Sequence, residues 1–150
     1  SALEYLKNNN LDKLIVSLRQ PVLGICLGLQ LMCNASEEAN TKCLGIFDVD
    51  VKKFDNSLAV ENASIKIPHM GWNTIYDLRS PLFSEVKENA FVYFVHSYYA
   101  ALSPQTIATS DYIIPFSAAI QKDNFYGVQF HTEKSAEAGI QIISNFLNIT

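Results

Sequence analysis

The sequence has few of the features that mark several large classes of protein. Its three cysteines, at positions 26, 33 and 43, include no C-x-x-C pair, so neither a disulfide framework nor a zinc site is indicated. Basic residues are fewer than acidic ones, 11 against 15, which argues against a nucleic-acid-binding surface. The most apolar region, 14–33, is interrupted by Arg19, Gln20 and Pro21, so no segment is predicted to span a membrane.

What is present is the composition of an ordinary globular domain. Hydrophobic residues make up 49% of the chain and charged residues 17%. A chain of this length buries roughly 70% of the surface that it exposes when unfolded. Because no repeat, linker or signal peptide is evident, we expect one domain over 1–150 with free thiols, working in the cytoplasm. We expect small molecules or a protein partner, and neither a metal nor a cofactor.

The apolar pattern of the first third alternates between helical and extended segments. Apolar residues at i, i+3, i+4 and i+7 predict a helix over 11–18 that ends before Pro21. Residues 21–25 form a short apolar run, typical of a strand buried on both faces. A second helical pattern starts at once, with apolar residues four positions apart at Leu27, Leu31 and Ala35.

The remainder of the chain reads mainly as strands. Alternation over 47–52 predicts a strand with one wet face, and 63–78 reads as two extended pieces around a Pro-His-Met-Gly turn. Residues 80–86 suggest a short helical turn, 90–100 a buried strand, and 116–131 a hairpin turning at 122–124. A closing helix, capped by Ser135, shares one face among Gly139, Ile142, Ile143 and Phe146. This order indicates an α/β layered fold with a mixed or antiparallel extension.

The strand predicted at 21–25 lacks an expected neighbour in the preceding sequence. A strand buried on both faces needs neighbours at its edges, yet only helix is predicted before Pro21. We therefore expect a fold that lacks its first β-α units.

Cys26 lies where the buried strand gives way to a helix, with Gly24 and Gly28 two residues away on either side. This is the arrangement of a nucleophile elbow, in which glycines avoid clashes at a strained turn. A helix N-terminus favours thiolate over thiol and is expected to lower the pKa of the sulfur. The N–H of Leu27 would face an oxyanion. We treat Cys33 and Cys43 as small hydrophobic residues.

The three histidines differ in their neighbours. His69, in a predicted turn, and His96, at a strand end, have no carboxylate two residues away, and we interpret both as satisfied polar groups. His131 has Glu133 at i+2, on the same face of a strand, where the carboxylate would orient the imidazole. Cys26, His131 and Glu133 are therefore predicted to form a Cys-His-Glu triad.

Two motifs about a hundred residues apart, "GICLGLQLM" and "YGVQFHTEKS", make the chain resemble the class I, or triad, glutamine amidotransferases. Their signatures are G-x-C-x-G-x-Q and a late His-x-Glu. The strings "CLGIFDVDVKKF", "KIPHMGWN" and "FVYFVHSYY" resemble in particular the glutaminase subunits of imidazole glycerol phosphate synthase. The resemblance implies the flavodoxin-like layered fold of that family.

The resemblance also implies an activity and a set of site residues. Cys26 would attack the side-chain amide of L-glutamine, His131 would move the proton, and a thioester would be hydrolysed to glutamate. Gly28 and Gln30 would line the glutamine pocket, and Ser97 and Tyr98 would hold the α-amino and carboxylate groups. The partner would be the cyclase subunit of imidazole glycerol phosphate synthase, in a heterodimer, with three residues facing it: Trp72, Tyr93 and Lys134. Without the resemblance, Trp72 and Tyr93 would be taken as core aromatics and Lys134 as a solvated charge.

The chain departs from the family in two ways. Thr132 stands where the family commonly has proline, and the N-terminal β-α units, with a Pro-Gly-rich loop that supplies a second oxyanion donor, are not in this sequence. Loss of one such donor typically costs about a hundred- to a thousandfold in rate. Two alternatives therefore stay open: a non-catalytic, partner-binding fragment or pseudo-enzyme, and a class I amidotransferase of anthranilate, purine or pyrimidine synthesis.

Overall fold

The computed structural model describes residues 1–58 and 65–149. Its largest element is a mixed sheet of eight described strands, in which β8 pairs with β9 and the other seven follow one another in the order β1-β10-β9-β7-β4-β2-β3. The pairs β1–β10 and β2–β4 are parallel and the others antiparallel. The strands are β1 (Val22–Ile25), β2 (Ala35–Ser36), β3 (Thr41–Lys42), β4 (Asp50–Lys53), β7 (Tyr98–Ala100), β8 (Thr106–Tyr112), β9 (Ile114–Lys122) and β10 (Phe125–Val128).

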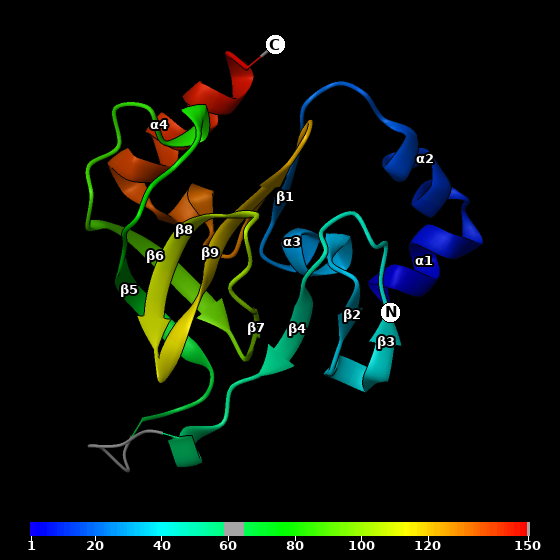
Figure 1. The fold of residues 1–150 in the computed structure, drawn as a ribbon, viewed down its shortest axis with the longest axis horizontal. Helices are drawn as coiled ribbons and strands as arrows, with labels where there is room; N and C mark the ends of the chain where they lie inside the picture. The colour runs from blue at the N-terminus through cyan, green and yellow to red at the C-terminus, as the bar shows by residue number, and fades with distance from the viewer. Residues whose placement is uncertain (59–64, 150) are drawn as a thin grey trace.

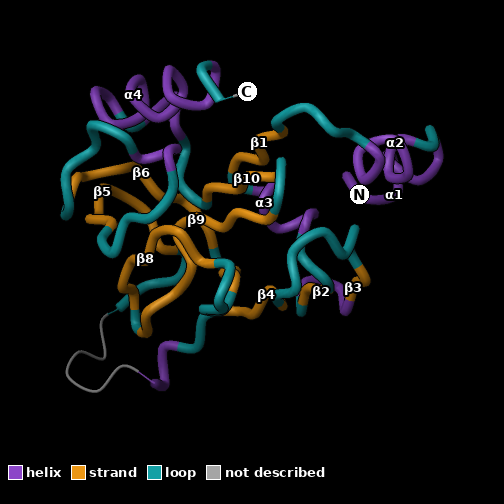
Figure 2. Tube along the Cα trace, turned by 45° about the horizontal axis from the view of Figure 1, so that its top comes forward, coloured by secondary structure: helices purple, strands orange, loops and turns teal. Residues whose placement is uncertain are grey.

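A second, two-stranded sheet is formed by β5 (His69–Ile75) and β6 (Ala90–His96), which pair antiparallel along their whole length. The helices are α1 (Ala2–Asn8), α2 (Leu11–Ser17), α3 (Leu27–Met32) and α4 (Ala136–Leu147), with short 3-10 turns at Glu38–Asn40, Asn56–Leu58, Pro81–Phe83 and Thr132–Lys134. In Figure 1, α4 lies on the side of the molecule that carries the β5–β6 sheet and contacts β6, whereas α1 and α2 lie at the opposite side, beyond α3. Figure 2 shows the same separation from another direction.

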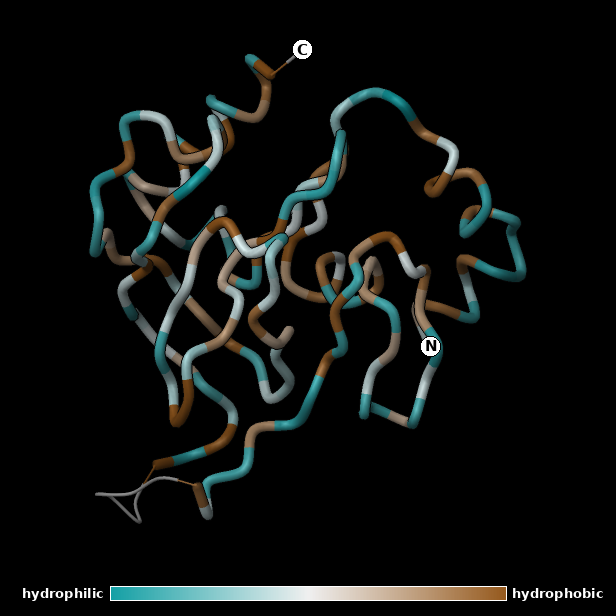
Figure 3. Tube along the Cα trace, viewed as in Figure 1, coloured by the Kyte–Doolittle hydropathy of each residue, from teal (hydrophilic) through white to brown (hydrophobic). Residues whose placement is uncertain are grey.

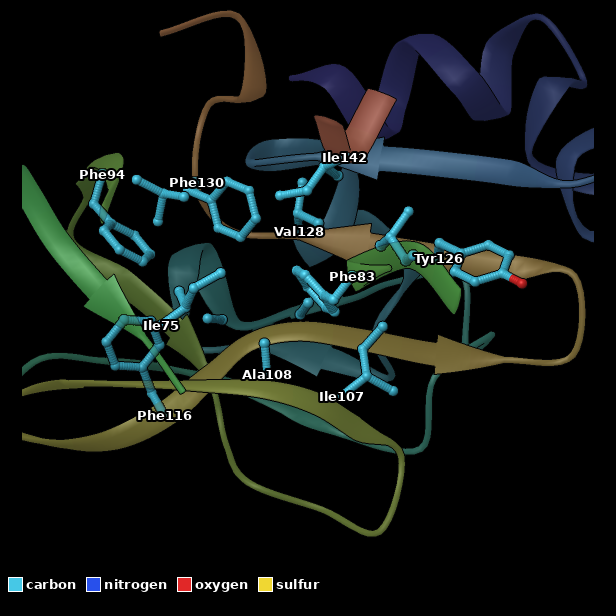
Figure 4. Packing of buried hydrophobic residues seen from close by; sticks show 14 of the residues in the cluster. Ile75, Phe83, Phe94, Ile107, Ala108, Phe116, Tyr126, Val128, Phe130 and Ile142 are labelled. Carbon is cyan, nitrogen blue, oxygen red and sulfur yellow. The ribbon is translucent and has the colours of Figure 1, made fainter. Parts of the chain in front are cut away.

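Two clusters of buried side chains hold these layers together. The larger lies between α4, the β5–β6 sheet and strands β8 to β10, and Figure 4 shows Ile142 of α4 above Val128, close to Phe130. The smaller surrounds α3, where the fully buried Leu29 packs with Phe47 and Val51. Because β10 contributes to both clusters, the strand that precedes His131 is firmly held from both sides.

The α/β fold, the mixed sheet, the strand after Pro21, the 3-10 turn at 81–83 and the hairpin between β9 and β10 agree with the sequence-based expectation. α4 also has the expected buried face, with Gly139 and Ile142 buried. The sequence pattern did not predict β8, whose polar and apolar residues do not alternate regularly.

The helix expected over 11–18 is observed as α2, although none of its residues is buried and Leu14 and Val16 are exposed. Figure 3 shows brown, apolar stretches along the N-terminal helices. Two expectations were wrong. β1 is only half-buried, with Gly24 its one buried residue, rather than buried on both faces. α3 ends at Met32 and buries Leu29, Gln30 and Met32 rather than the predicted stripe, while Ala35 belongs to β2.

Three further expectations need correction. The predicted strand over 47–52 begins only at Asp50, although Phe47 and Val49 are buried. His69 is the first residue of β5 and not part of a turn. Ser135 precedes α4 but makes no capping hydrogen bond, because its hydroxyl donates to the His131 carbonyl and accepts from the Tyr93 N–H. Part of the first predicted extended piece, 63–64, lies outside the described residues.

Candidate active site

Cys26 occupies the junction between β1 and α3 in a strained backbone conformation. Its φ of 53° and ψ of −103° lie in a region that residues with a Cβ rarely adopt. Its N–H donates to the Val128 carbonyl over 2.8 Å, which continues the parallel pairing of β1 with β10. A strand that ends in a fixed hydrogen bond and turns at once into a helix holds the sulfur at one position above the sheet.

The two flanking glycines have different roles. A Cβ on Gly24 would lie 2.6 Å from the Met32 sulfur and 2.7 Å from the Gly28 carbonyl carbon, so this glycine is needed for β1 and α3 to approach. A Cβ on Gly28 would meet nothing within 4 Å. The expectation that both glycines avoid a clash is therefore wrong for Gly28, which faces open space beside Cys26.

The thiol of Cys26 has two kinds of neighbour. Its Sγ accepts a hydrogen bond from Nε2 of Gln129 at 3.6 Å and lies 3.9 Å from the Val95 carbonyl oxygen, to which the thiol donates. Burial raises the pKa of the thiol above its ordinary value; the Leu27 N–H and Gln129 act in the opposite direction. The expectation of a net lowering was wrong, because α3 is short and desolvation outweighs its N-terminus.

His131 and Glu133 form the expected pair. Nδ1 of His131 lies 2.7 Å from Oε1 of Glu133, and the imidazole is about one-quarter exposed. The local structure differs from the expectation, because β10 ends at Val128 and Glu133 belongs to the 3-10 turn Thr132–Lys134. This turn brings the side chains of His131 and Glu133 together, as the predicted strand would have done. Burial raises the pKa of Glu133, but hydrogen bonds from its own N–H and from His131, with the nearby charge of Lys134, hold it below its ordinary value.

The structure brings the two parts of the predicted triad to the same edge of the sheet. Cys26 is level with Gln129 in the parallel pairing, and His131 follows two residues later, where its N–H donates to the Tyr93 carbonyl. Among the described residues, Sγ of Cys26 has hydrogen bonds with Gln129 and Val95 but none with His131. In structures without substrate, catalytic contacts are often longer than in the reacting complex.

Two of the residues expected to bind the substrate, Gln30 and Tyr98, are in contact. Gln30 is buried, and its Nε2 donates to the Tyr98 carbonyl and to Oε1 of Gln129, both over 3.0 Å. Ser97 and Tyr98 are half-buried at the connection of β6 to β7. Leu27 and Gln30 line a cavity of about 290 Å³ that extends to α1 and to residues 36–43. A Gln at this position, which the sequence alone would place at the surface, is an interior residue.

Trp72, Tyr93 and Lys134 meet on the outer face of the β5–β6 sheet. Trp72 and Tyr93 are cross-strand partners whose rings lie 5.9 Å apart at a steep angle, and Nζ of Lys134 lies 5.7 Å from the Tyr93 ring centroid. Trp72 is 52% exposed, so it is not a core aromatic. This aromatic cluster adjoins the turn that carries Glu133.

His69 and His96 are buried and hydrogen-bonded to each other over 3.0 Å. Asn73 contacts His69 at 3.3 Å, and His96 contacts the Tyr98 carbonyl at 2.7 Å. Both are satisfied polar groups, as expected. Burial lowers the pKa of His69 to about 3 and that of His96 to about 4.

The strained cysteine follows β1, and the His–Glu pair follows the neighbouring strand β10. Comparison with known families agrees with this arrangement. The family model for class I glutamine amidotransferases matches residues 4–149. The chain is a class I glutamine amidotransferase. Within residues 1–58 and 65–149, no helix is long and apolar enough to cross a membrane, and no group of His, Cys, Asp and Glu could hold a metal ion.

Relatives of this amidotransferase carry a more specific name. It is 59% identical over 145 residues to the imidazole glycerol phosphate synthase subunit HisH of Bacteroides fragilis strain YCH46, covering 97% of this chain and 72% of the relative. It is 46% identical over 151 aligned positions to the subunit of that name from Escherichia coli K12, covering 99% and 74%. A glutamine amidotransferase of Thermotoga maritima superposes with a TM-score of 0.61 at 20% identity, over 98% of this chain and 56% of that one, and this likeness supports the fold alone.

Gln129 is a site residue that sequence reasoning missed. It lies on the strand that leads to His131, and it would be found only by pairing 22–25 with 125–128 in parallel, which sets it opposite Cys26.

Proposed function

We propose that this chain is the glutaminase subunit of an imidazole glycerol phosphate synthase, which hydrolyses L-glutamine and delivers ammonia to a cyclase subunit in histidine biosynthesis. The observation that carries the glutaminase activity is the parallel pairing of β1 with β10, which sets the strained Cys26 beside the strand that leads to the His131–Glu133 pair. The relatives named HisH support the choice of this synthase over other amidotransferases. A cytoplasmic heterodimer belongs to the same proposal.

The proposed reaction has two halves. His131 takes the thiol proton, and the Cys26 thiolate then attacks the side-chain amide carbon of glutamine. The C–S bond forms, and the negative charge moves to the carbonyl oxygen, near the N–H of Leu27. The C–N bond then breaks, and the proton held by His131 goes to the leaving nitrogen, which departs as ammonia. Glu133 keeps the imidazole in one tautomer and stabilises its protonated form.

The second half regenerates the enzyme. Water loses a proton to His131 and attacks the thioester carbon, the C–S bond breaks, and the sulfur leaves with the electron pair and recovers its proton. The balance is glutamine and water in, glutamate and ammonia out. Gly28, Gln30, Ser97 and Tyr98 are proposed to bind glutamine, consistent with the open space beside Gly28 and the cavity at Gln30.

The proposed docking surface for the cyclase is the aromatic cluster of Trp72, Tyr93 and Lys134. An exposed tryptophan in edge-to-face contact with a second aromatic ring that also contacts a lysine is the composition that interface anchors favour. Because the cluster lies beside Glu133, a cyclase bound there would lie near the point where ammonia leaves.

The test is glutamate release from L-glutamine, with and without a cyclase subunit bound to its nucleotide ligand. Release that rises with the liganded cyclase and disappears in Cys26→Ala supports the proposal. Cys33→Ser, which removes a buried thiol that contacts the Leu29 carbonyl and does not line the cavity at Gln30, is the matched control and retains release. A folded chain that binds the cyclase without releasing glutamate would instead be a pseudo-enzyme, and release that ignores the cyclase would point to another amidotransferase.

A further inference from the structure

Gln129 places a buried carboxamide directly against the nucleophile. Its side chain is fully buried, with Nε2 at 3.6 Å from Sγ of Cys26 and Oε1 at 3.0 Å from Nε2 of Gln30. Cys26 and Gln30 already have proposed roles, but the contact of the Gln129 amide with the Cys26 sulfur has none. A buried amide in a fixed position next to a reactive sulfur is a candidate for part of the chemistry.

The orientation of the carboxamide is determined by the groups that hold it. The Tyr98 carbonyl is an acceptor only, so the Gln30 atom that faces it at 3.0 Å is the donor Nε2. The same Nε2 carries a second hydrogen, which is directed at Gln129, so the Gln129 atom at this contact is the acceptor Oε1. The remaining end of the amide, an N–H donor, therefore faces the sulfur.

The site otherwise disfavours a negative charge on the Cys26 sulfur, and this N–H donor offsets that effect. Burial disfavours the anionic sulfur, and the Val95 carbonyl oxygen at 3.9 Å presents a negative dipole that accepts from a thiol but repels a thiolate. The favourable contacts come from the Leu27 N–H and from Gln129. Since the Leu27 N–H is also the proposed oxyanion donor and His131 gives up its proton during the reaction, Gln129 is the neutral donor that stays at the sulfur throughout the cycle.

We propose that Gln129 is a catalytic residue, whose side-chain N–H stabilises negative charge on the Cys26 sulfur and aims the sulfur at the substrate. This inference rests on the proposed glutaminase function. The contact acts twice: it stabilises the thiolate before the C–S bond forms, and it stabilises the sulfur again when that bond breaks during thioester hydrolysis. In the tetrahedral intermediates the charge lies on the carbonyl oxygen, and in the neutral thioester neither atom is charged, so the amide then serves only to position the sulfur.

The experiment compares Gln129→Met with Gln121→Met in the full chain. Methionine matches the length of glutamine without a donor, and Gln121 makes its own side-chain hydrogen bond, to the Tyr126 hydroxyl, away from Cys26. The first readout is the rate of Cys26 alkylation by iodoacetamide against pH, followed by mass spectrometry of the peptide so that Cys33 and Cys43 do not contribute. The second is kcat and KM for glutamate release in the presence of the cyclase.

In Gln129→Met we expect the midpoint of alkylation to move upward by about one pH unit or more, with a fall in kcat of about tenfold or more at neutral pH and little change in KM. Gln121→Met keeps both midpoint and kcat. An unchanged midpoint in a folded Gln129→Met chain overturns the inference. If that variant does not fold, Gln30→Met decides, because it frees the amide to turn and is expected to raise the midpoint by less; no shift there also overturns it.

The two proposals fail in different ways. A wild-type chain that releases no glutamate with the cyclase refutes the glutaminase function, whereas the alkylation midpoint still reports on Gln129 without any turnover. A normal wild-type rate with an unchanged Gln129→Met midpoint refutes only the role of Gln129.

Discussion

At the scale of single residues, the site depends on side chains whose orientation is fixed by a second group. His131 has Glu133 on one ring nitrogen at 2.7 Å, and the tautomer that this contact selects leaves Nε2 free to accept a proton from substrate or thiol. Cys26 is held by its own N–H to Val128 and by Gln129 on the sulfur. Each reacting atom is therefore positioned by a neighbour rather than by its own rotamer alone.

Substitution Glu133→Gln tests the His131 pair. Glutamine keeps the shape of the side chain but removes the charge that stabilises protonated His131, so we expect kcat to fall by about a hundredfold or more with a small change in KM. Steady-state glutamate release measures both. Glu137→Gln, in the first turn of α4 and without a part in the site, is the matched control. Comparable kcat values in the two variants would contradict the orienting role.

At the scale of elements, Gly24 and Gly28 at the junction of β1 with α3 are expected to differ in their effect on stability. Gly24→Ala forces a Cβ to 2.6 Å from the Met32 sulfur and 2.7 Å from backbone, and we expect a loss of about 1–3 kcal/mol in the free energy of unfolding. Gly28→Ala meets no atom and lies inside a helix, so stability is expected to stay equal or to rise by about 0.5–1 kcal/mol. Urea unfolding of both variants measures this difference.

The variants Gly24→Ala and Gly28→Ala also distinguish an effect on folding from an effect on substrate binding. Because the space beside Gly28 belongs to the proposed glutamine pocket, the stable Gly28→Ala variant is expected to show a raised KM for glutamine. If Gly28→Ala is instead the less stable variant, the assignment of the close contact to Gly24 is wrong.

The aromatic cluster on the β5–β6 sheet supports a prediction about partner binding. Lys134→Ala removes the cation that covers Tyr93, so we expect the stimulation of glutamate release by the cyclase to fall by about fivefold or more. Basal turnover should change less. Titration of the cyclase against release rate measures the effect, with Lys122→Ala at the β9–β10 turn as control. Equal loss of basal and stimulated rates would argue against an interface role.

The expectations that failed were also errors at the element scale. Apolar residues spaced four apart predicted that α3 buries Leu27 and Leu31, but the buried face is that of Leu29 and Met32, because the helix lies against β10 and Phe47. α2 forms where its apolar spacing predicts a helix, yet none of its side chains is fully buried. Spacing identifies a helix and an apolar face; which element covers that face depends on tertiary contacts.

At the scale of the whole molecule, the buried His69–His96 pair joins β5 to β6, and His96 also contacts the carbonyl of Tyr98, the first residue of β7. The folded pKa values, about 3 and about 4, lie below the ordinary 6.5, so the unfolded chain binds more protons than the folded one between these limits. The stabilisation is therefore complete above pH 6.5 and is lost as the pH falls toward about 4.

We expect the free energy of unfolding to decrease through this window by about 1.4 kcal/mol per pH unit for each histidine. Urea unfolding at pH 7.5, 6.5, 5.5 and 4.5 measures the slope. His69→Phe, which keeps a ring between Phe94 and Tyr112, removes one titrating group and should give a shallower slope. An identical slope in the variant would show that other groups carry the acid sensitivity.

The sequence by itself determined the fold class, the turn at Cys26 and the contact of His131 with Glu133. These depend on local spacing: glycines around a strand-to-helix turn, or two residues separated by one in the chain, are brought together by backbone geometry alone. Only the tertiary structure decided the burial of Gln30, the raised pKa of Cys26, the exposure of Trp72 and the place of Gln129. Each of these depends on β1 and β10, or β5 and β6, lying side by side, and a pairing between segments many residues apart determines which groups lose water and which keep it.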